Sequence, residues 1–206
     1  MRITLSLSET CSNLRSSILA EPFDLTGKIL MAMPAMEDPR FANSVILLCA
    51  HSDDGAMGLM VNKPVDRMVK ADLFEQLGVE GCAEALAGRV HSGGPVERER
   101  GFVLHSADYD SALSSLDVSE DLRMTATLDI LEDIAMGDGP RRVLFALGYC
   151  GWGPGQLEAE IGQNGWLIGA ADTETIFGVD DARKWTRALA EEGLDPLVLS
   201  GVAGRA

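Results

Sequence analysis

The stretch LGYCGWGPGQLEAEIGQNGW, residues 147–166, decides the fold, because a strand, a turn and a helix follow one another within it. A β-rich run at 142–147 leads into the stretch. Gly153-Pro154-Gly155 then opens a helix over 156–163, with Pro154 near its first turn. Leu157 and Ile161 form the buried face of that helix. A further strand is expected at 165–171.

Outward from this stretch, short strands and helices mix without strict alternation. Ser52-Asp53-Asp54-Gly55 is a turn between two strands of a hairpin. Thr127 resembles a helix cap, with Leu128, Leu131 and Ala135 facing inward and Gly137 ending the helix. This mixture predicts an α+β fold, a mixed and mainly antiparallel sheet surrounded by helices. The other expected strands are 28–33, 44–51, 56–62, 89–92, 101–106 and 122–126, and the other expected helices are 70–77, ending at Gly78, and one that begins at Asp180 or Asp181.

The chain is long enough for one core, and no linker divides it. It has 206 residues, of which 46% are hydrophobic and 24% charged, as in ordinary globular proteins. We expect a loosely ordered, Ser/Thr-rich arm at 1–26 and a single domain at 27–206. No apolar segment approaches the length of a membrane span, and residues 1–22 contain no apolar block of signal-peptide length. We therefore expect a cytoplasmic protein with no membrane association.

The net charge of −15, from 17 basic and 32 acidic residues, disfavours direct binding to nucleic acid or anionic lipid. No helix carries a stripe of Lys and Arg that could read bases. The four cysteines form no C-x-x-C pair, so reduced thiols are expected. His51 with Asp53 and Asp54 would make an incomplete metal site, and no P-loop or dinucleotide motif appears. We expect no metal and no cofactor.

Glycine-rich loops are the candidate ligand sites. Gly93-Gly94-Pro95 is expected to turn tightly between two strands, either as a structural hairpin or as a concave set of N–H groups that binds an anion or a carbonyl oxygen. The loop from Gly151 and Trp152 to Gly155 leads into a helix N-terminus, a second place for an anion. Its alternative interpretation is a plain strand–helix turn.

Polar side chains near these loops complete the candidate set. Gln156 and Glu160 lie one turn apart on the polar face of the helix, where Glu160 could act as a general base or hold an amine. His105 ends an expected strand and could carry a proton, although a packing role is the simpler interpretation. The candidate ligand-binding residues are Asn62, Gly93, Gly94, Pro95, His105, Gly151, Trp152, Gln156, Glu158 and Glu160, and no residue is assigned a catalytic role.

Taken in order, three motifs resemble the AlgH/YqgE-like family of small bacterial proteins. They read GAMGLMVNKP at 55–64, SGGPVERERGFVLH at 92–105 and LGYCGWGPGQLEAEIGQNGW at 147–166, and the similarity extends over about residues 27–204. The chain departs from the family pattern at His91 and Ser92, so His91 is not taken as functional. The resemblance implies a strongly bent, barrel-like sheet. It also implies that Glu158 and Glu160 belong to a motif.

Two functions remain open. The resemblance implies a transcriptional regulator, and the acidic composition implies that such regulation is indirect, through a protein partner or a small ligand. The alternative is an enzyme that acts on a small anionic metabolite at the glycine-rich loops.

Overall fold

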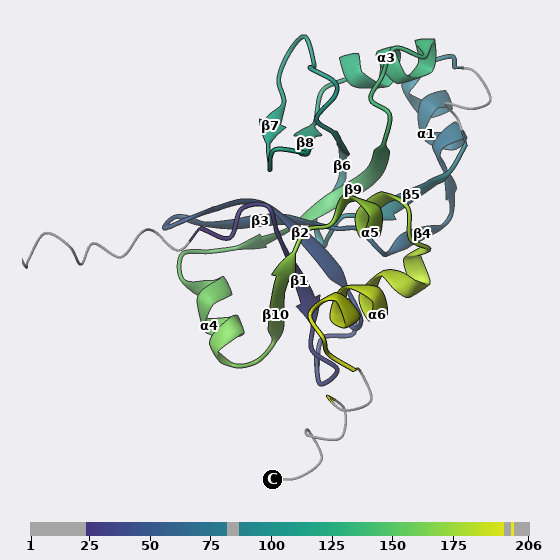
Figure 1. The fold of residues 1–206 in the computed structure, drawn as a ribbon. Helices are drawn as coiled ribbons and strands as arrows, with labels where there is room; N and C mark the ends of the chain where they lie inside the picture. Colours follow the sequence, from purple (N-terminus) through teal and green to yellow (C-terminus); the bar gives the residue numbers. More distant parts are fainter. Residues whose placement is uncertain (1–23, 82–86, 196–198, 200–206) are drawn as a thin grey trace, which may run out of the picture.

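The computed structural model describes residues 24–81, 87–195 and 199. A ten-stranded sheet forms the body of the protein, and helices cover both of its faces (Figure 1). Its strands are β1 (Lys28–Ala32), β2 (Val45–Ser52), β3 (Gly55–Met60), β4 (Pro64–Val69), β5 (Arg89–Ser92), β6 (Val96–Ser106), β7 (Leu116–Asp117), β8 (Leu122–Thr125), β9 (Val143–Trp152) and β10 (Trp166–Ala170).

Five helices are described, and glycines in the left-handed conformation cap the C-terminal ends of two of them. Gly78 and Gly137 adopt left-handed conformations at the ends of the first two, where they return N–H groups to helical carbonyls. Both of these ends lie where the sequence predicts them. The helices are α1 (Lys70–Leu77), α3 (Asp129–Met136), α4 (Gln156–Gly162), α5 (Thr173–Phe177) and α6 (Asp181–Glu191).

The sheet is mixed and mainly antiparallel, as the sequence predicts, and it curls into a half-barrel. Its main path runs β10-β1-β2-β3-β9-β6-β8-β7, with β5 joined to β9 and β4 joined to β5. Among the pairs described, only β5 with β9 is parallel. The expected hairpin is confirmed, since Ser52 pairs with Gly55 and Ile46 with Met60 across β2 and β3.

Strand β9 is the centre of the sheet, and the expected Gly-Gly-Pro hairpin is wrong. Residues 145–147 of β9 pair with β5 and also with β6, so these two strands lie on opposite edges of β9. The Gly93-Gly94-Pro95 segment joins β5 to β6 and therefore has to cross β9. A Cβ atom on Gly94 would overlap the carbonyl of Tyr149, and one on Gly93 would overlap the carbonyl oxygen of Gly148. The glycines are needed for close backbone approach, not for a positive φ.

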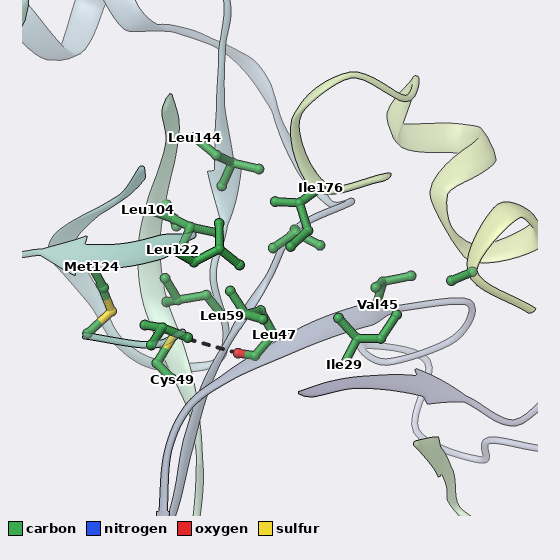
Figure 2. Packing of buried hydrophobic residues seen from close by; sticks show 14 of the residues in the cluster. Ile29, Val45, Leu47, Cys49, Leu59, Leu104, Leu122, Met124, Leu144 and Ile176 are labelled. Atoms are coloured by element: carbon green, nitrogen blue, oxygen red, sulfur yellow. Dashed lines mark hydrogen bonds between the residues drawn. The ribbon is translucent and has the colours of Figure 1, made fainter. Parts of the chain in front are cut away.

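Two apolar layers form on the two faces of the strands. On one face, Ile29, Leu47 and Leu144 pack with Ile176 of α5 (Figure 2). Trp185 and Leu189 of α6 belong to the same cluster. On the other face, α4 covers one end and α1 with α3 the other end. Successive side chains of β9 point alternately to the two layers, because Leu144 and Ala146 face the first layer while Phe145 faces α1 and α3.

Several local predictions need correction. Strands β4 and β7 and helix α5 were not predicted, and β6 and β9 are longer than expected. Leu128 is the N-cap of α3 and is 57% exposed, so it does not face inward, whereas Leu131 and Ala135 are buried as predicted. The short, exposed edge strand β7 carries little alternation of apolar residues, which is why its sequence gives no strand signal. Most of the expected arm at 1–26 lies outside the described residues.

Candidate functional site: an acidic cleft lined by tryptophan

A cleft of about 930 Å³ opens between the 33–41 loop, the end of β9, helix α4 and the start of β10. Trp152 closes β9 and Trp166 opens β10, so the α4 connection brings the two indoles together. The residues that line the cleft are Met33, Pro34, Ala35, Met36, Glu37, Asp38, Arg40, Phe41, Pro95, Cys150, Gly151, Trp152, Gln156, Glu160, Gln163, Asn164, Gly165, Trp166 and Leu199.

The carboxylate of Glu160 lies at the centre of the polar contacts in this cleft. Its Oε2 accepts hydrogen bonds from the indole N–H groups of Trp152 at 2.9 Å and Trp166 at 2.8 Å. Its Oε1 accepts a bond from the Gln156 side-chain amide at 2.9 Å. The three donors fix the direction of the carboxylate. In return, the carboxylate gives a hydrogen-bond acceptor to the indole N–H groups of two residues that are only 7% and 4% exposed.

The local sequence explains this arrangement. Gly155 takes a left-handed conformation as the N-cap of α4, and the side-chain oxygen of Gln156 accepts the Gly153 N–H at 3.1 Å. The other end of Gln156 then reaches Glu160 one helical turn later. Because the Gly153 N–H is bound by a side chain and α4 has only seven residues, this helix start does not present the open set of donors that an anion site needs.

Aromatic rings and charges form the walls. Trp152 and Trp166 meet edge to face with centroids 6.1 Å apart, and Phe41 meets Trp166 at 5.6 Å. Arg40 is held by Asp38 at 2.5 Å, and this hydrogen bond lowers the pKa of the Asp38 carboxyl. Glu37 and Glu160 are then left as excess negative charge among the lining residues. An acidic wall of this kind attracts cations and repels anions.

The cleft brings together half of the residues that the sequence indicates. Pro95, Gly151, Trp152, Gln156 and Glu160 all line it, although Pro95 is more than 50 positions away along the chain. Gly93 and Gly94 do not line it. They belong to the crossing over β9, where Gly93 N–H donates to Leu147 and Gly93 carbonyl accepts from Met60.

Asn62 and Glu158 make contacts outside the cleft. Asn62 accepts the Val45 N–H and donates to the Asn43 carbonyl, so it joins the segment after β3 to the start of β2. Leu25 N–H donates to His51 Nδ1, which leaves the hydrogen on His51 Nε2 to be donated to Glu158 at 2.7 Å. The pKa of Glu158 is lowered by a hydrogen bond from the backbone N–H of Glu158 itself and by this hydrogen bond from His51.

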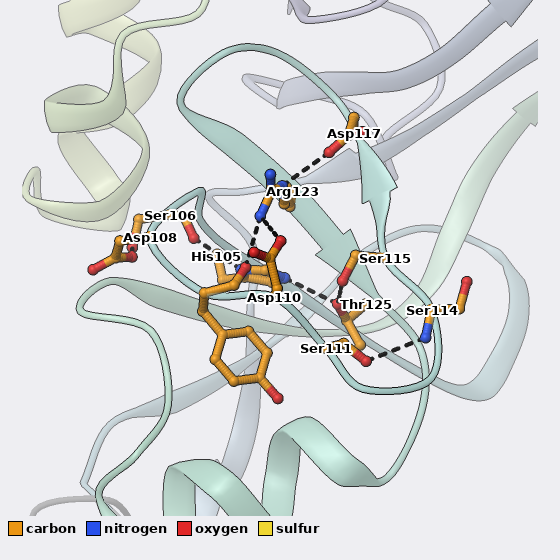
Figure 3. Close-up of polar contacts among 11 residues, drawn as sticks. His105, Ser106, Asp108, Asp110, Ser111, Ser114, Ser115, Asp117, Arg123 and Thr125 are labelled. Atoms are coloured by element: carbon orange, nitrogen blue, oxygen red, sulfur yellow. Dashed lines mark hydrogen bonds and ion pairs between the residues drawn. The ribbon is translucent and has the colours of Figure 1, made fainter.

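His105 is a buried packing residue in the structure. Its Nδ1 donates to the Ser106 carbonyl and its Nε2 accepts from the Thr125 hydroxyl, both at 2.9 Å (Figure 3). Burial lowers the pKa of His105, so the neutral ring is the form that fits these contacts. Both nitrogens are therefore used, and the ring lies outside the cleft.

The sequence analysis missed the far wall of the cleft. Trp166 lies in the third motif but was not taken as a site residue, and Met33, Pro34, Arg40 and Phe41 were not among the candidate residues. An apolar residue in a loop looks like a packing residue when its spatial neighbours are unknown, and this signal alone could not have identified the wall. Within the described part of the chain, no group of three or more His, Cys, Asp or Glu could hold a metal ion.

Comparison with known proteins gives one consistent family. The AlgH-like family profile matches residues 29–197. A UPF0301 protein of Ruegeria pomeroyi is 59% identical over 184 residues, which cover 89% of this chain and all of the relative, and one of Cereibacter sphaeroides is 55% identical over 183 residues with the same coverage.

Two solved structures share the fold. The solution structure of the AlgH protein from Pseudomonas aeruginosa has a TM-score of 0.73 at 38% identity, covering 91% of this chain and 97% of that one. A Corynebacterium diphtheriae protein has a TM-score of 0.67 at 23% identity, covering 87% and 92%. Among the described residues, no helix has the length and apolar character needed to cross a membrane.

Proposed function

The chain belongs to the AlgH-like family, and we propose that it is a cytoplasmic regulatory protein that acts by binding a partner in the tryptophan-lined cleft, without contacting DNA. One observation carries the proposal. The cleft of about 930 Å³ combines apolar walls with a carboxylate, Glu160, whose orientation is fixed by three donors. Concave sites with apolar walls and a few fixed polar groups are where proteins bind ligands.

The charges of the cleft indicate the chemistry of the partner. With Arg40 held by Asp38, the excess charge comes from Glu37 and Glu160. A small anion would have to approach these carboxylates within a chain of net charge −15. We therefore propose a partner segment that presents an apolar side chain next to a basic one, with the basic group directed toward Glu160.

The lining favours binding over catalysis. No serine, threonine or histidine lies among the described residues that line the cleft. Cys150 is present, but burial raises its pKa to about 12, so its thiol is a poor nucleophile at neutral pH. The residues at hand suit recognition, and they lack the nucleophile–base pair that covalent catalysis uses.

Matched peptides test this proposal. Calorimetric titration of the purified protein with acetylated and amidated Leu-Phe-Arg-Leu should give measurable binding, and the peptide Leu-Phe-Glu-Leu should bind at least about tenfold more weakly, as expected for loss of one charged hydrogen bond. Equal binding of the two peptides, or tighter binding of the acidic one, would show that the cleft does not select a basic group.

A gel-shift assay at low salt tests the second half of the proposal. The pure protein should not retard duplex DNA, because few phosphate contacts can form on an acidic surface. Tight and salt-sensitive retardation would contradict indirect action.

A further inference from the structure

A second cavity of about 330 Å³ lies where strand β5 meets helices α5 and α6, and we call it the lysine pocket. Its charged lining consists of Lys70, Arg89, Lys184, Asp180 and Asp181, with His91 beside them. With a neutral imidazole, the lining carries one more positive than negative charge. That sign is unexpected in a chain whose net charge is −15.

Three of these groups form a fixed cluster on the wall. Asp181 Oδ1 accepts from His91 Nε2 at 3.0 Å and from the Lys184 ammonium at 2.9 Å, and Lys184 also donates to the Val61 carbonyl at 2.7 Å. Burial acts to raise the pKa of Asp181, but the hydrogen bonds from His91 and Lys184 lower it to about 2. The cluster is thus internally neutral, and it holds the start of α6 against the sheet.

One atom of the cluster has an unused bonding position. His91 is 8% exposed, and its Nδ1 has no hydrogen-bond partner among the described residues. A buried polar atom left without a partner costs free energy, so such atoms often mark a place where a water, an ion or a ligand binds. His91 lies on the wall of the lysine pocket, and because its Nε2–H donates to Asp181, its Nδ1 carries a lone pair that can accept a hydrogen bond.

The remaining cations lack carboxylate partners. Within the described part of the chain, Lys70 and Arg89 take part in no ion pair, while Asp180 is the one acid on the wall outside the fixed cluster. The Lys70 ammonium lies 4.7 Å from the centre of the Phe145 ring, and burial lowers the pKa of Lys70. A half-buried ammonium without a carboxylate gains most from an anion brought to it.

We propose that the lysine pocket binds a small oxyanion, a phosphate or a carboxylate, between Lys70 and Arg89, with a hydroxyl group of the ligand or a water bound to it donating the hydrogen bond that His91 Nδ1 accepts. This site is separate from the tryptophan-lined cleft and does not depend on the function proposed for it. Arg89 is exposed at the rim, so it can reach an anion bidentately, and Lys70 supplies a point charge beside it.

Titration with inorganic phosphate, followed by NMR of the histidine rings, tests the site. The chain has three histidines, so three imidazoles report independently. Phosphate should shift the His91 signals and leave those of His51 and His105 unchanged, with sodium chloride at equal ionic strength as the control for screening. A parallel titration with acetate tells whether the preferred group is a phosphate or a carboxylate. If neither anion moves the His91 signals beyond the chloride control, the proposal is wrong.

Charge-removing variants locate the binding. Lys70→Met and Arg89→Met should each lower the affinity for the anion by about tenfold or more, which is the expected loss for one charged hydrogen bond. Lys28→Met removes the same charge from an exposed residue that does not line the pocket, and it should leave the affinity unchanged. Equal weakening by all three variants would mean that only the net charge matters and would overturn the proposed site.

Discussion

At the scale of single residues, Glu160 has two roles that mutation can separate. Its carboxylate satisfies the indole N–H groups of Trp152 and Trp166, and it also supplies negative charge to the cleft. The sequence indicated Glu160 from its motif and its helical spacing. It gave no sign of the two tryptophans as partners, because their meeting depends on the geometry of β9 and β10.

Replacement of Glu160 should therefore have graded effects. Glu160→Gln keeps an oxygen for both indoles, so we expect a loss of about 1 kcal/mol in the free energy of unfolding. Glu160→Ala leaves two nearly buried N–H donors without a partner and should cost about 2–4 kcal/mol. Urea denaturation measures both. Gln163→Ala, an exposed position in the same cleft, should change stability by less than about 0.5 kcal/mol.

The alternative outcome for Glu160 is equally informative. If Glu160→Ala were as stable as the wild type, the indole contacts would contribute nothing to folding, and the carboxylate would be present for binding alone.

His105 should make the stability depend on pH in a defined window. Because burial lowers its pKa in the folded state, the unfolded chain binds the proton first as pH falls below about 6.5. Stability is thus fully present above that pH and declines below it. Asp181, whose pKa is lowered from 3.8 to about 2, affects the stability only at a more acidic pH, as its carboxylate becomes protonated.

A series of urea denaturations from neutral pH to about pH 5 checks the His105 prediction. His105→Gln should unfold more easily at neutral pH, since it loses the paired contacts to Ser106 and Thr125, but its stability should fall less steeply with acidification. If the free energy of unfolding fell equally steeply with pH in the variant and the wild type, His105 would not titrate differently in the folded and unfolded states.

At the scale of elements, the Gly93-Gly94-Pro95 segment exists to cross strand β9. Its two glycines press against the backbone of Gly148, Tyr149 and Cys150, and Gly148 has room for no side chain either, since a Cβ there would lie 2.6 Å from the Gly94 carbonyl oxygen. The composition of the segment correctly indicated a connection between two strands, although the tight turn expected there is not present. It could not indicate a crossing, because the choice between a hairpin and a crossing depends on which strand lies between β5 and β6.

Gly94→Ala should thus destabilise the protein by more than about 3 kcal/mol, through overlap with the Tyr149 carbonyl. Gly101→Ala is the matched control in β6, where a Cβ atom would meet nothing within 4 Å, and it should be neutral or slightly stabilising. Thermal denaturation of the two variants compares them. If the Gly94→Ala variant had the melting temperature of the wild type, the 93–95 segment would be able to move away from β9 at no cost, contrary to its close packing in the structure.

Most elements with a strong pattern of their own were predicted correctly, and those that depend on tertiary context were not. The β2–β3 hairpin has a long apolar strand and a clear turn, and α1 has a glycine stop, so both are readable from the sequence. Helix α5, with five residues, and the short strand β7 carry no sustained period. Their formation depends on the capping of α5 by Asp172 and the pairing of β7 with β8.

At the scale of the whole molecule, the charges are distributed unevenly, and this distribution organises the proposed functions. The tryptophan-lined cleft is acidic, whereas the lysine pocket has a positive lining. Net charge, read from the sequence, disfavours a nucleic-acid interface but says nothing about such local sites. His91 illustrates the limit, because its departure from the family pattern set it aside, while its burial and its unpartnered Nδ1 make it notable in the structure.

The central claim, that the tryptophan-lined cleft binds an apolar segment with a basic group, can be tested by the indole N–H signals of the three tryptophans. Trp152 and Trp166 donate to Glu160 inside the cleft, whereas Trp185 donates to the Ala32 carbonyl under α6 and serves as the internal control. On titration of ¹⁵N-labelled protein with the peptide Leu-Phe-Arg-Leu, the signals of Trp152 and Trp166 should shift and that of Trp185 should stay in place. Unmoved signals for Trp152 and Trp166, or equal shifts with Leu-Phe-Glu-Leu, would contradict the account.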